Sequence, residues 1–228
     1  MTTRQLYFDL PVRTGRTRGD YFVSEANGAA VAAIDGWRNW PGRALLIRGP
    51  KGMGKTHLAH VWTREAGARL ISGLALTEAD AIPGDVAVDD AHLVAGDPAR
   101  ERALFHLYNL TLAEGGHLLL TGDGDPALWP VRLPDLGSRL RGAASVELQP
   151  PDDRLLEAMI VKLFDDRQIA PPPSLVAYLL RRMERSAAEA VRLVAALDDA
   201  ALASGRPIGT KLARDVLGAE DGADILPD

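Results

Sequence analysis

One eight-residue loop constrains the fold of this 228-residue chain more than any other feature of its sequence. The loop follows an apolar run, Ala44 to Ile47, and precedes a segment with apolar residues at helical spacing. It matches the phosphate-binding P-loop, in which glycines let backbone N–H groups surround phosphate oxygens at the start of a helix. A glycine-rich turn is the alternative, but the strand before the loop and the helix after it favour a nucleotide site. The loop residues are Gly49, Pro50, Lys51, Gly52, Met53, Gly54, Lys55 and Thr56.

Two side chains of the loop and two carboxylates further along the chain predict how a nucleotide is held. In a P-loop, Lys55 reaches the β- and γ-phosphates, and the Thr56 hydroxyl binds Mg²⁺. Asp89 and Asp90 end the apolar run that starts at Val86. We therefore predict ADP or ATP with Mg²⁺ as cofactors, Thr56 and Asp89 as magnesium ligands, and Asp90 as the group that polarises water. Two solvated carboxylates at a strand end are the alternative.

Short apolar runs that alternate with helical patterns predict the fold class. Such alternation is typical of an α/β domain whose parallel sheet is covered on both faces, and beyond residue 150 only helical patterns follow. We predict a nucleotide-binding α/β domain with a five-stranded parallel sheet over residues 20–150, a small all-helical lid over 151–218, and an acidic tail over 219–228. Strands are expected around 44–47, 70–71, 86–88, 118–120 and 146–148, and helices around 27–37, 58–62, 98–114, 153–167, 174–184, 187–203 and 210–217.

A further strand end offers a contact for the γ-phosphate. The apolar run from Leu118 to Leu120 ends in Thr121, Gly122 and Asp123. Because the carboxyl ends of parallel strands meet at one edge of a sheet, we expect Thr121 or Asp123 near the P-loop. An ordinary strand-ending turn is the alternative.

Composition limits the class of protein. The fractions of hydrophobic residues (46%) and charged residues (25%) are ordinary for a globular protein, and the absence of cysteine excludes disulfides and thiolate metal sites. A net charge of −5 argues against a protein built mainly to grip nucleic acid. The chain has no apolar run of about 18 residues and no signal-peptide pattern, so we expect a cytoplasmic protein with no membrane partner.

The order of these elements resembles that of an AAA+ ATPase, in which a P-loop domain precedes a small helical lid. More narrowly, the P-loop with His57 directly after it resembles that of the bacterial replication initiator DnaA. Tyr21, Phe22 and Val23, followed by Asn27, resemble a box that the initiator family carries ahead of its first helix. The resemblance spans nearly the whole chain, and it implies that all five residues contribute to nucleotide binding.

A second box concerns a neighbouring subunit. The segment from Leu136 to Leu140 resembles the initiator motif whose arginine is a finger presented to the ATP of a neighbour. The resemblance implies that Arg139 is this catalytic finger, although Arg141 lies close by. Surface arginines on a solvated turn are the alternative.

The lid departs from the family pattern. The family carries a sensor arginine at the start of its third lid helix, and Arg192 resembles it in local context. Alignment on the leucines that follow places Val191 there instead, with Arg185 as a fallback contact. If Val191 is the equivalent, hydrolysis by this chain is impaired and ADP is the expected resident nucleotide.

The chain stops where the initiator continues into a helix-turn-helix domain, so it resembles the Hda family of short initiator homologues, in its Ala- and Arg-rich alphaproteobacterial form. Residues 1–19 then resemble the flexible segment with which that family docks into the sliding clamp. A glutamine followed by spaced apolar side chains suits a groove, the glutamine setting the register and the apolar groups giving affinity. A strand held on its own domain is the alternative. The expected clamp-binding residues are Gln5, Leu6, Phe8 and Leu10.

This resemblance implies a negative regulator of replication initiation. Tethered to the DNA-loaded clamp, the β subunit of DNA polymerase III, it is expected to present Arg139 to ATP held by DnaA and to promote hydrolysis of that ATP. DNA is contacted only through the clamp, and assembly into a homo-oligomer is compatible with the family. An autonomous ATPase of helicase-loader type, using Asp89 and Asp90, is the second hypothesis. A small-molecule kinase is disfavoured by the separate helical lid.

Overall fold

The central strands of the fold are continuous apolar runs, because a strand covered on both faces has no solvated side. The structure, a computed structural model, describes residues 23–24 and 26–223. Its five strands are all parallel and lie in the order β2-β3-β4-β1-β5. This confirms the predicted α/β class with a five-stranded parallel sheet. The strands are β1 (Ala44–Arg48), β2 (Arg69–Ser72), β3 (Val86–Asp89), β4 (Leu118–Gly122) and β5 (Ala144–Glu147).

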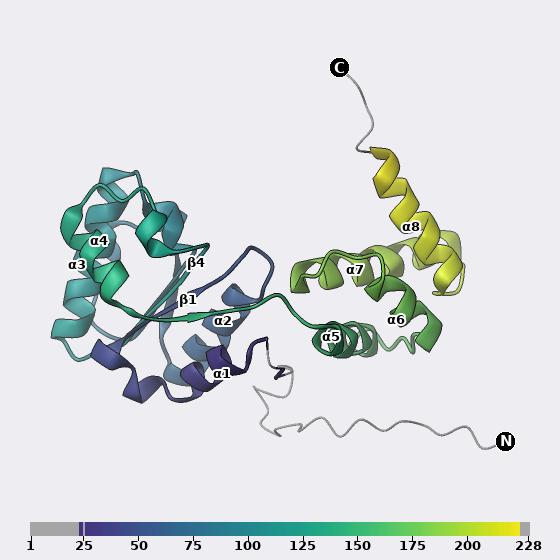
Figure 1. Ribbon diagram of the computed structural model, residues 1–228, viewed down its shortest axis with the longest axis horizontal. Coiled ribbons are helices and arrows are strands. Elements are labelled where there is room, and N and C mark those ends of the chain that lie inside the picture. Colours follow the sequence, from purple (N-terminus) through teal and green to yellow (C-terminus); the bar gives the residue numbers. More distant parts are fainter. Residues whose placement is uncertain (1–22, 25, 224–228) are drawn as a thin grey trace.

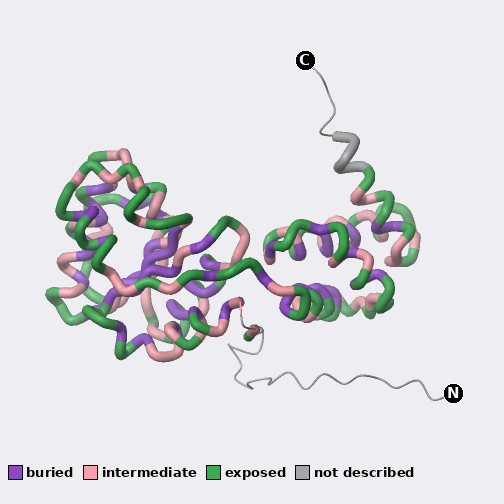
Figure 2. Tube along the Cα trace, viewed as in Figure 1, coloured by how far each residue is buried: buried purple, intermediate pink, exposed green. Residues whose placement is uncertain are grey.

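Alternate residues of the strands face two separate helical layers. Leu46 and Leu120 pack with helices α3 and α4, whereas Leu45 and Leu119 pack with α1 and α2 on the opposite face. The central strands β3, β4 and β1 are therefore buried between the layers (Figure 2), whereas the edge strands β2 and β5 are partly exposed. The helices of these layers are α1 (Gly28–Asp35), α2 (Lys55–Ala66), α3 (Pro98–Ala113) and α4 (Pro134–Gly142). Short 3-10 helices connect the elements at Trp37–Asn39, Pro41–Arg43, Gly73–Ala75, Glu78–Asp80, Ala91–Val94 and Pro126–Leu128.

Four helices follow the sheet and have an apolar core of their own (Figure 1). Leu156, Phe164 and Leu197 are fully buried in it. The last helix continues past the predicted end at Leu217, as far as Ala223. In the described part of the chain, the helices are too short or too polar to cross a bilayer. The four are α5 (Asp153–Asp165), α6 (Pro173–Leu180), α7 (Ala187–Ser204) and α8 (Thr210–Ala223).

A buried glutamate fixes the start of α4. Glu101 of α3 is only 1% exposed, and its carboxylate accepts hydrogen bonds from the backbone N–H groups of Gly96, Arg132 and Leu133 at 2.8 to 3.0 Å. Leu133 is the N-cap residue of α4. Burial raises the pKa of Glu101, but the hydrogen bonds from Arg132, Gly96 and Leu133 outweigh it, and the pKa lies below its ordinary value of 4.5.

We expect Glu101→Gln to lower the free energy of unfolding by about 1–3 kcal/mol at neutral pH, because an amide replaces a charged acceptor of three N–H groups. Since the pKa is depressed in the folded state, the carboxylate's contribution is present above 4.5 and is lost as the pH falls through the folded-state value. Urea denaturation should therefore show a gap between wild type and variant that closes in acid. Glu114→Gln, at the exposed end of the same helix, should change stability by less than about 0.5 kcal/mol. If wild type and Glu101→Gln differed by the same free energy of unfolding at neutral and at acidic pH, the charge of the carboxylate would not be the source of the difference.

Candidate nucleotide-binding site

The loop that precedes α2 has the backbone conformation of a phosphate cradle. Gly49, Gly52 and Gly54 all have positive φ, at 150°, 83° and 95°, which residues with a Cβ rarely adopt. A Cβ at Gly49 would also lie 2.7 Å from the backbone oxygen of Leu148. The loop thus delivers its N–H groups and the N-terminus of a twelve-residue helix to one point, where an anion is stabilised.

The P-loop lysine lies within this cradle. Lys55 is 5% exposed, and its ammonium donates to the backbone oxygens of Gly49 and Pro50 at 2.7 and 2.8 Å. It also pairs with the carboxylate of Asp123 at 2.5 Å. Lys51, the other lysine of the loop, is exposed.

The predicted magnesium ligands lie together at the carboxyl edge of the sheet. The Thr56 hydroxyl donates to Oδ2 of Asp89 at 2.9 Å, and the Thr121 hydroxyl donates to Oδ1 of Asp89 at 2.5 Å. Hydroxyl and carboxylate oxygens beside a phosphate cradle are the donor set that Mg²⁺ prefers. Thr56 and Asp89 would therefore hold the ion, and Thr121 orients the carboxylate. When bound, Mg²⁺ neutralises charge on the phosphates.

Asp90 has an unusual backbone conformation directly after β3. Its φ of 54° places it in the left-handed region, and its N–H donates to the Thr121 hydroxyl at 2.9 Å. Carboxylate or ring-nitrogen atoms of Asp90, His92 and Asp123 lie within 4.8 Å of one another. The sequence pattern did not single out His92, which the fold brings there through the short helix after β3.

Asp123 is the strand-end residue that reaches the P-loop, and Thr121 instead contacts Asp89. The indole N–H of Trp129 donates to the backbone oxygen of Asp123 at 2.7 Å, and Nε2 of His92 is 3.7 Å from its carboxylate. A side chain at Gly122 would overlap the Trp129 ring, at 2.4 Å. These contacts fix the turn after β4, and they hold the Asp123 carboxylate beside the ammonium of Lys55.

This arrangement predicts an effect on the choice between diphosphate and triphosphate. The carboxylate of Asp123 competes with a γ-phosphate for the Lys55 ammonium and repels it, because both are anions. Asp123→Asn should therefore raise the affinity for ATP relative to ADP by about tenfold, which corresponds to about 1.4 kcal/mol. Calorimetric titration with ADP and with a non-hydrolysable ATP analogue measures the ratio. A ratio that stays at the wild-type value would rule out this role for the carboxylate.

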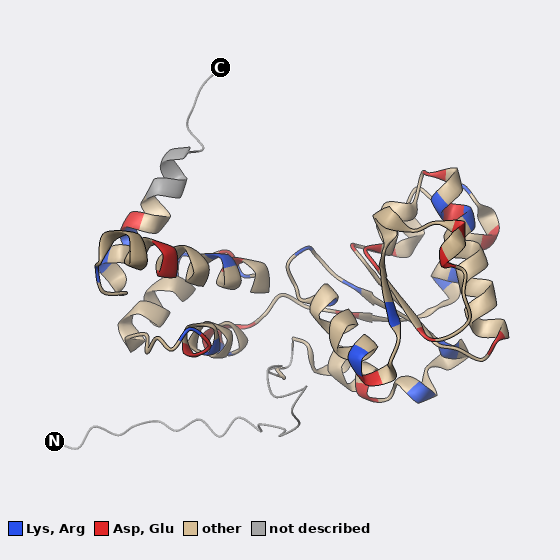
Figure 3. Cartoon of the chain, turned by 180° about the vertical axis from the view of Figure 1, so that it is seen from behind, with Lys and Arg blue, Asp and Glu red and all other residues tan. Residues whose placement is uncertain are grey.

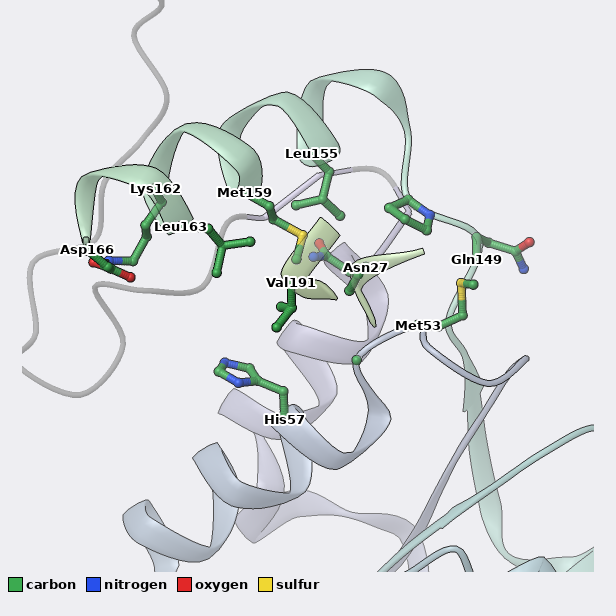
Figure 4. A pocket seen from close by; sticks show the side chains of 13 residues that line it. Asn27, Met53, His57, Gln149, Leu155, Met159, Lys162, Leu163, Asp166 and Val191 are labelled. Atoms are coloured by element: carbon green, nitrogen blue, oxygen red, sulfur yellow. The ribbon is translucent and has the colours of Figure 1, made fainter. Parts of the chain in front are cut away.

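A cavity of about 290 Å³ lies beside the P-loop, between α2 and the lid (Figure 4). Its walls are mainly apolar, with a few polar groups, which suits the flat ring of a nucleotide base. Of the predicted nucleotide contacts, Asn27, Met53, Gly54 and His57 line it. The lining residues from the rest of the chain are Gln149, Pro151, Leu155, Met159, Lys162, Leu163, Asp166, Ala187 and Val191.

The lid presents Val191 to this cavity, and Arg192 is turned elsewhere. Ala187 and Val191 are four residues apart on α7 and share the face that lines the cavity, whereas Arg192 makes a two-pronged ion pair with Glu189 at 2.7 and 2.8 Å. Arg185 pairs with Asp153 at 2.7 Å. Val191 is therefore the one of these two neighbours that lines the cavity.

The N-terminus of α7 is bonded directly to the P-loop. The backbone oxygen of Gly52 accepts hydrogen bonds from the N–H groups of Ala187 and Ala188 at 3.0 and 3.3 Å. A Cβ at Gly52 would lie 3.1 Å from that of Ser186, so a larger residue would crowd the start of α7 as well as strain the positive φ of 83°. These contacts hold the lid against the loop.

Arg139 lies on the opposite face of the sheet from α2. It is exposed on α4, while Leu136 and Leu140 of the same helix are buried against α3. Of the remaining predicted residues, Val23 is half exposed. The others lie outside the described residues: Gln5, Leu6, Phe8, Leu10, Tyr21 and Phe22.

Comparison with known proteins shows which proteins share the fold of this chain. No family model matches the chain. Domain III of the replication initiation protein DnaA from Thermotoga maritima superposes with a TM-score of 0.77 at 19% identity, covering 92% of this chain and 98% of that domain.

Two longer proteins are similar over most of this chain. AMPPCP-bound DnaA from Aquifex aeolicus has a TM-score of 0.67 at 19% identity, covering 83% of this chain and 65% of that protein. The RuvB Holliday junction branch migration motor of Thermotoga maritima has a TM-score of 0.65 at 17% identity, covering 85% of this chain and 68% of that protein. The chain therefore has the fold of the AAA+ P-loop ATPases, in the arrangement found in DnaA domain III.

Proposed function

We propose that this chain is a nucleotide-bound regulator of replication initiation, which promotes hydrolysis of ATP held by the DnaA initiator. The observation that carries the proposal is the position of Arg139. It is exposed on α4, on the other face of the sheet from the helix that opens the chain's own phosphate site. A guanidinium placed there suits the nucleotide of a neighbouring molecule better than its own.

The chemistry asked of Arg139 is charge stabilisation. As the γ-phosphoryl group transfers to water, charge develops on its oxygens, and an arginine supplied in trans accelerates hydrolysis by about 10³–10⁵ in comparable systems. The fold resemblance to DnaA supports a head-to-tail contact with the initiator, because domains of one fold can continue a shared mode of assembly. The catalytic nucleotide then belongs to the partner.

The chain's own nucleotide has a structural role in this proposal. Its cavity is closed partly by lid residues, and the N-terminus of α7 bonds to the P-loop, so a bound nucleotide stabilises one lid position. The Asp123 carboxylate beside Lys55 and the Val191 side chain on the cavity wall both favour ADP over ATP as the resident ligand.

The N-terminal segment supplies the tether. Gln5 and the apolar residues after it are proposed to bind the sliding clamp on DNA, so that the clamp brings the chain to newly replicated DNA. The net charge of −5 and the interspersed acidic and basic residues in both parts of the fold (Figure 3) agree with indirect contact.

The test is single-turnover hydrolysis of labelled ATP preloaded on DnaA. With clamp-loaded DNA present, the chain should accelerate hydrolysis, and Gln5→Ala should need a much higher concentration to reach the same rate. Omission of the clamp should have the same effect as Gln5→Ala. Unchanged hydrolysis with all components present would refute the proposal.

A second candidate, an autonomous ATPase of helicase-loader type, is favoured by the complete Thr56–Asp89 pair. Turnover of ATP by the chain alone discriminates between the two. The regulator predicts slow turnover that mutation of Asp90 hardly alters, whereas the autonomous enzyme predicts turnover that Asp90→Asn abolishes.

A further inference from the structure

The guanidinium of Arg139 lies over two aromatic rings of the neighbouring helix α3. Its central carbon is 5.7 Å from the centre of the Phe105 ring and 5.4 Å from the centre of the Tyr108 ring. Both distances are within the range of a cation–π contact. Phe105 and Tyr108 are three residues apart, so they share one face of the helix.

The rings are fixed, while the cation above them stays accessible. Tyr108 is 5% exposed and belongs to the core between the sheet and α3, and the partly buried Phe105 packs against that core. Arg139 is exposed. Tyr108 and Arg139 also interact electrostatically: burial holds the pKa of the Tyr108 phenol above its ordinary value, and the charge of Arg139 acts in the opposite direction.

The nearby Arg141 has a different environment. Its Nη2 donates to the Ser138 hydroxyl at 3.4 Å, and its Nη1 lies 3.0 Å from where a Cβ of Gly137 would stand. Arg141 therefore folds back along its own helix, over a glycine that leaves room for it. Of these two arginines, Arg139 is the one that lies over aromatic rings.

We propose that Phe105 and Tyr108 are positioning residues, which hold the Arg139 guanidinium ready for a partner's phosphate. A planar cation resting on aromatic faces keeps its N–H groups free at the rim, so it can still donate to phosphate oxygens. A side chain that is already confined loses less conformational freedom when it enters the transition state, which raises the rate. This inference rests on the proposed function of Arg139.

The test is a double-mutant cycle in the single-turnover assay with DnaA-bound ATP. Phe105→Leu removes a ring and keeps an apolar side chain, and it should lower the maximal stimulated rate by about fivefold, the order expected for an exposed cation–π contact. The concentration for half-maximal stimulation should stay unchanged. Phe105→Tyr keeps the ring and should retain the wild-type rate. In the Arg139→Ala background, Phe105→Leu should make no further difference.

A readout without a partner checks the contact itself. Ring currents should displace the Arg139 Nε–Hε resonance in the NMR spectrum, and Phe105→Leu should move it toward the value of a solvated arginine. An unmoved resonance would overturn the inference.

The kinetic outcomes separate the two claims. If Arg139→Ala abolishes stimulation while Phe105→Leu leaves the maximal rate intact, or alters only the half-maximal concentration, the positioning role is wrong and the proposed function stands. If stimulation survives Arg139→Ala, the proposed function fails and the positioning role fails with it.

Discussion

Lys55→Ala is expected to weaken nucleotide binding by at least about 100-fold, or 2.7 kcal/mol. Lys55 is the buried cation of the phosphate cradle, and its ammonium is held by the Gly49 and Pro50 carbonyls and by Asp123. Removal of this charge leaves the Asp123 carboxylate facing the phosphates with no compensating cation beside it. Loss of a charged hydrogen bond and the new repulsion both act against binding.

Titration with a fluorescent ADP analogue measures this effect, and thermal unfolding gives a second view. Ligand at 100 times its dissociation constant stabilises a protein by about 2.7 kcal/mol, so ADP should raise the unfolding temperature of wild type but not of the variant. The matched control is Lys51→Ala, because Lys51 is the exposed lysine of the same loop. Its affinity should stay within about threefold of wild type. Binding by Lys55→Ala within tenfold of wild type would contradict the cradle geometry.

The strands and the P-loop could be predicted from the sequence because their signals are local. A run such as Leu118 to Leu120 reads as a strand covered on both faces, and the glycine spacing around Lys55 reads as a phosphate loop. Because the carboxyl ends of parallel strands share one edge, the sequence also predicted Thr121 or Asp123 near that loop, and Asp123 is the one that reaches it.

The ion pair and hydrogen bonds that fix side chains in and around the candidate site could not be predicted, because they join distant parts of the chain. Asp123 pairs with a lysine 68 positions earlier, and nothing local to either residue indicates that pairing. Likewise, Glu101 is an ordinary charged residue in the sequence, and only the fold brings the backbone of Arg132 and Leu133 to it.

The alternatives Val191 and Arg192 show why a one-residue shift in a sequence alignment matters in a helix. Each position turns the side chain by about 100°, so neighbouring residues face different surroundings. The sequence left Val191 and Arg192 as alternatives. In the structure, Val191 shares the cavity face of α7 with Ala187, whereas Arg192 pairs with Glu189.

Arg139→Ala is expected to lower the stimulated hydrolysis of DnaA-bound ATP by about 10³-fold, close to the rate without the chain. The guanidinium is the proposed source of charge stabilisation in the transition state, and alanine leaves no donor in its place. Arg139→Lys should restore only a small part of the rate, since an ammonium cannot make the paired, planar contacts of a guanidinium. Nucleotide binding by the chain itself should not change, because Arg139 lies across the sheet from α2.

Arg141→Ala is the matched control for this prediction. It removes the same charge from the same helix, but Arg141 folds back toward Ser138, whereas Arg139 is the arginine that lies over Phe105 and Tyr108. Its stimulated rate should stay within about threefold of wild type, because an exposed charge at this distance contributes little.

The decisive measurement is therefore the lifetime of ATP preloaded on DnaA, with clamp-loaded DNA and either wild type, Arg139→Ala or Arg141→Ala. We predict rapid loss of ATP with wild type and with Arg141→Ala, and persistence of ATP with Arg139→Ala. Persistence of ATP with wild type, or equally rapid loss with Arg139→Ala, would show that this chain does not act on the initiator through Arg139.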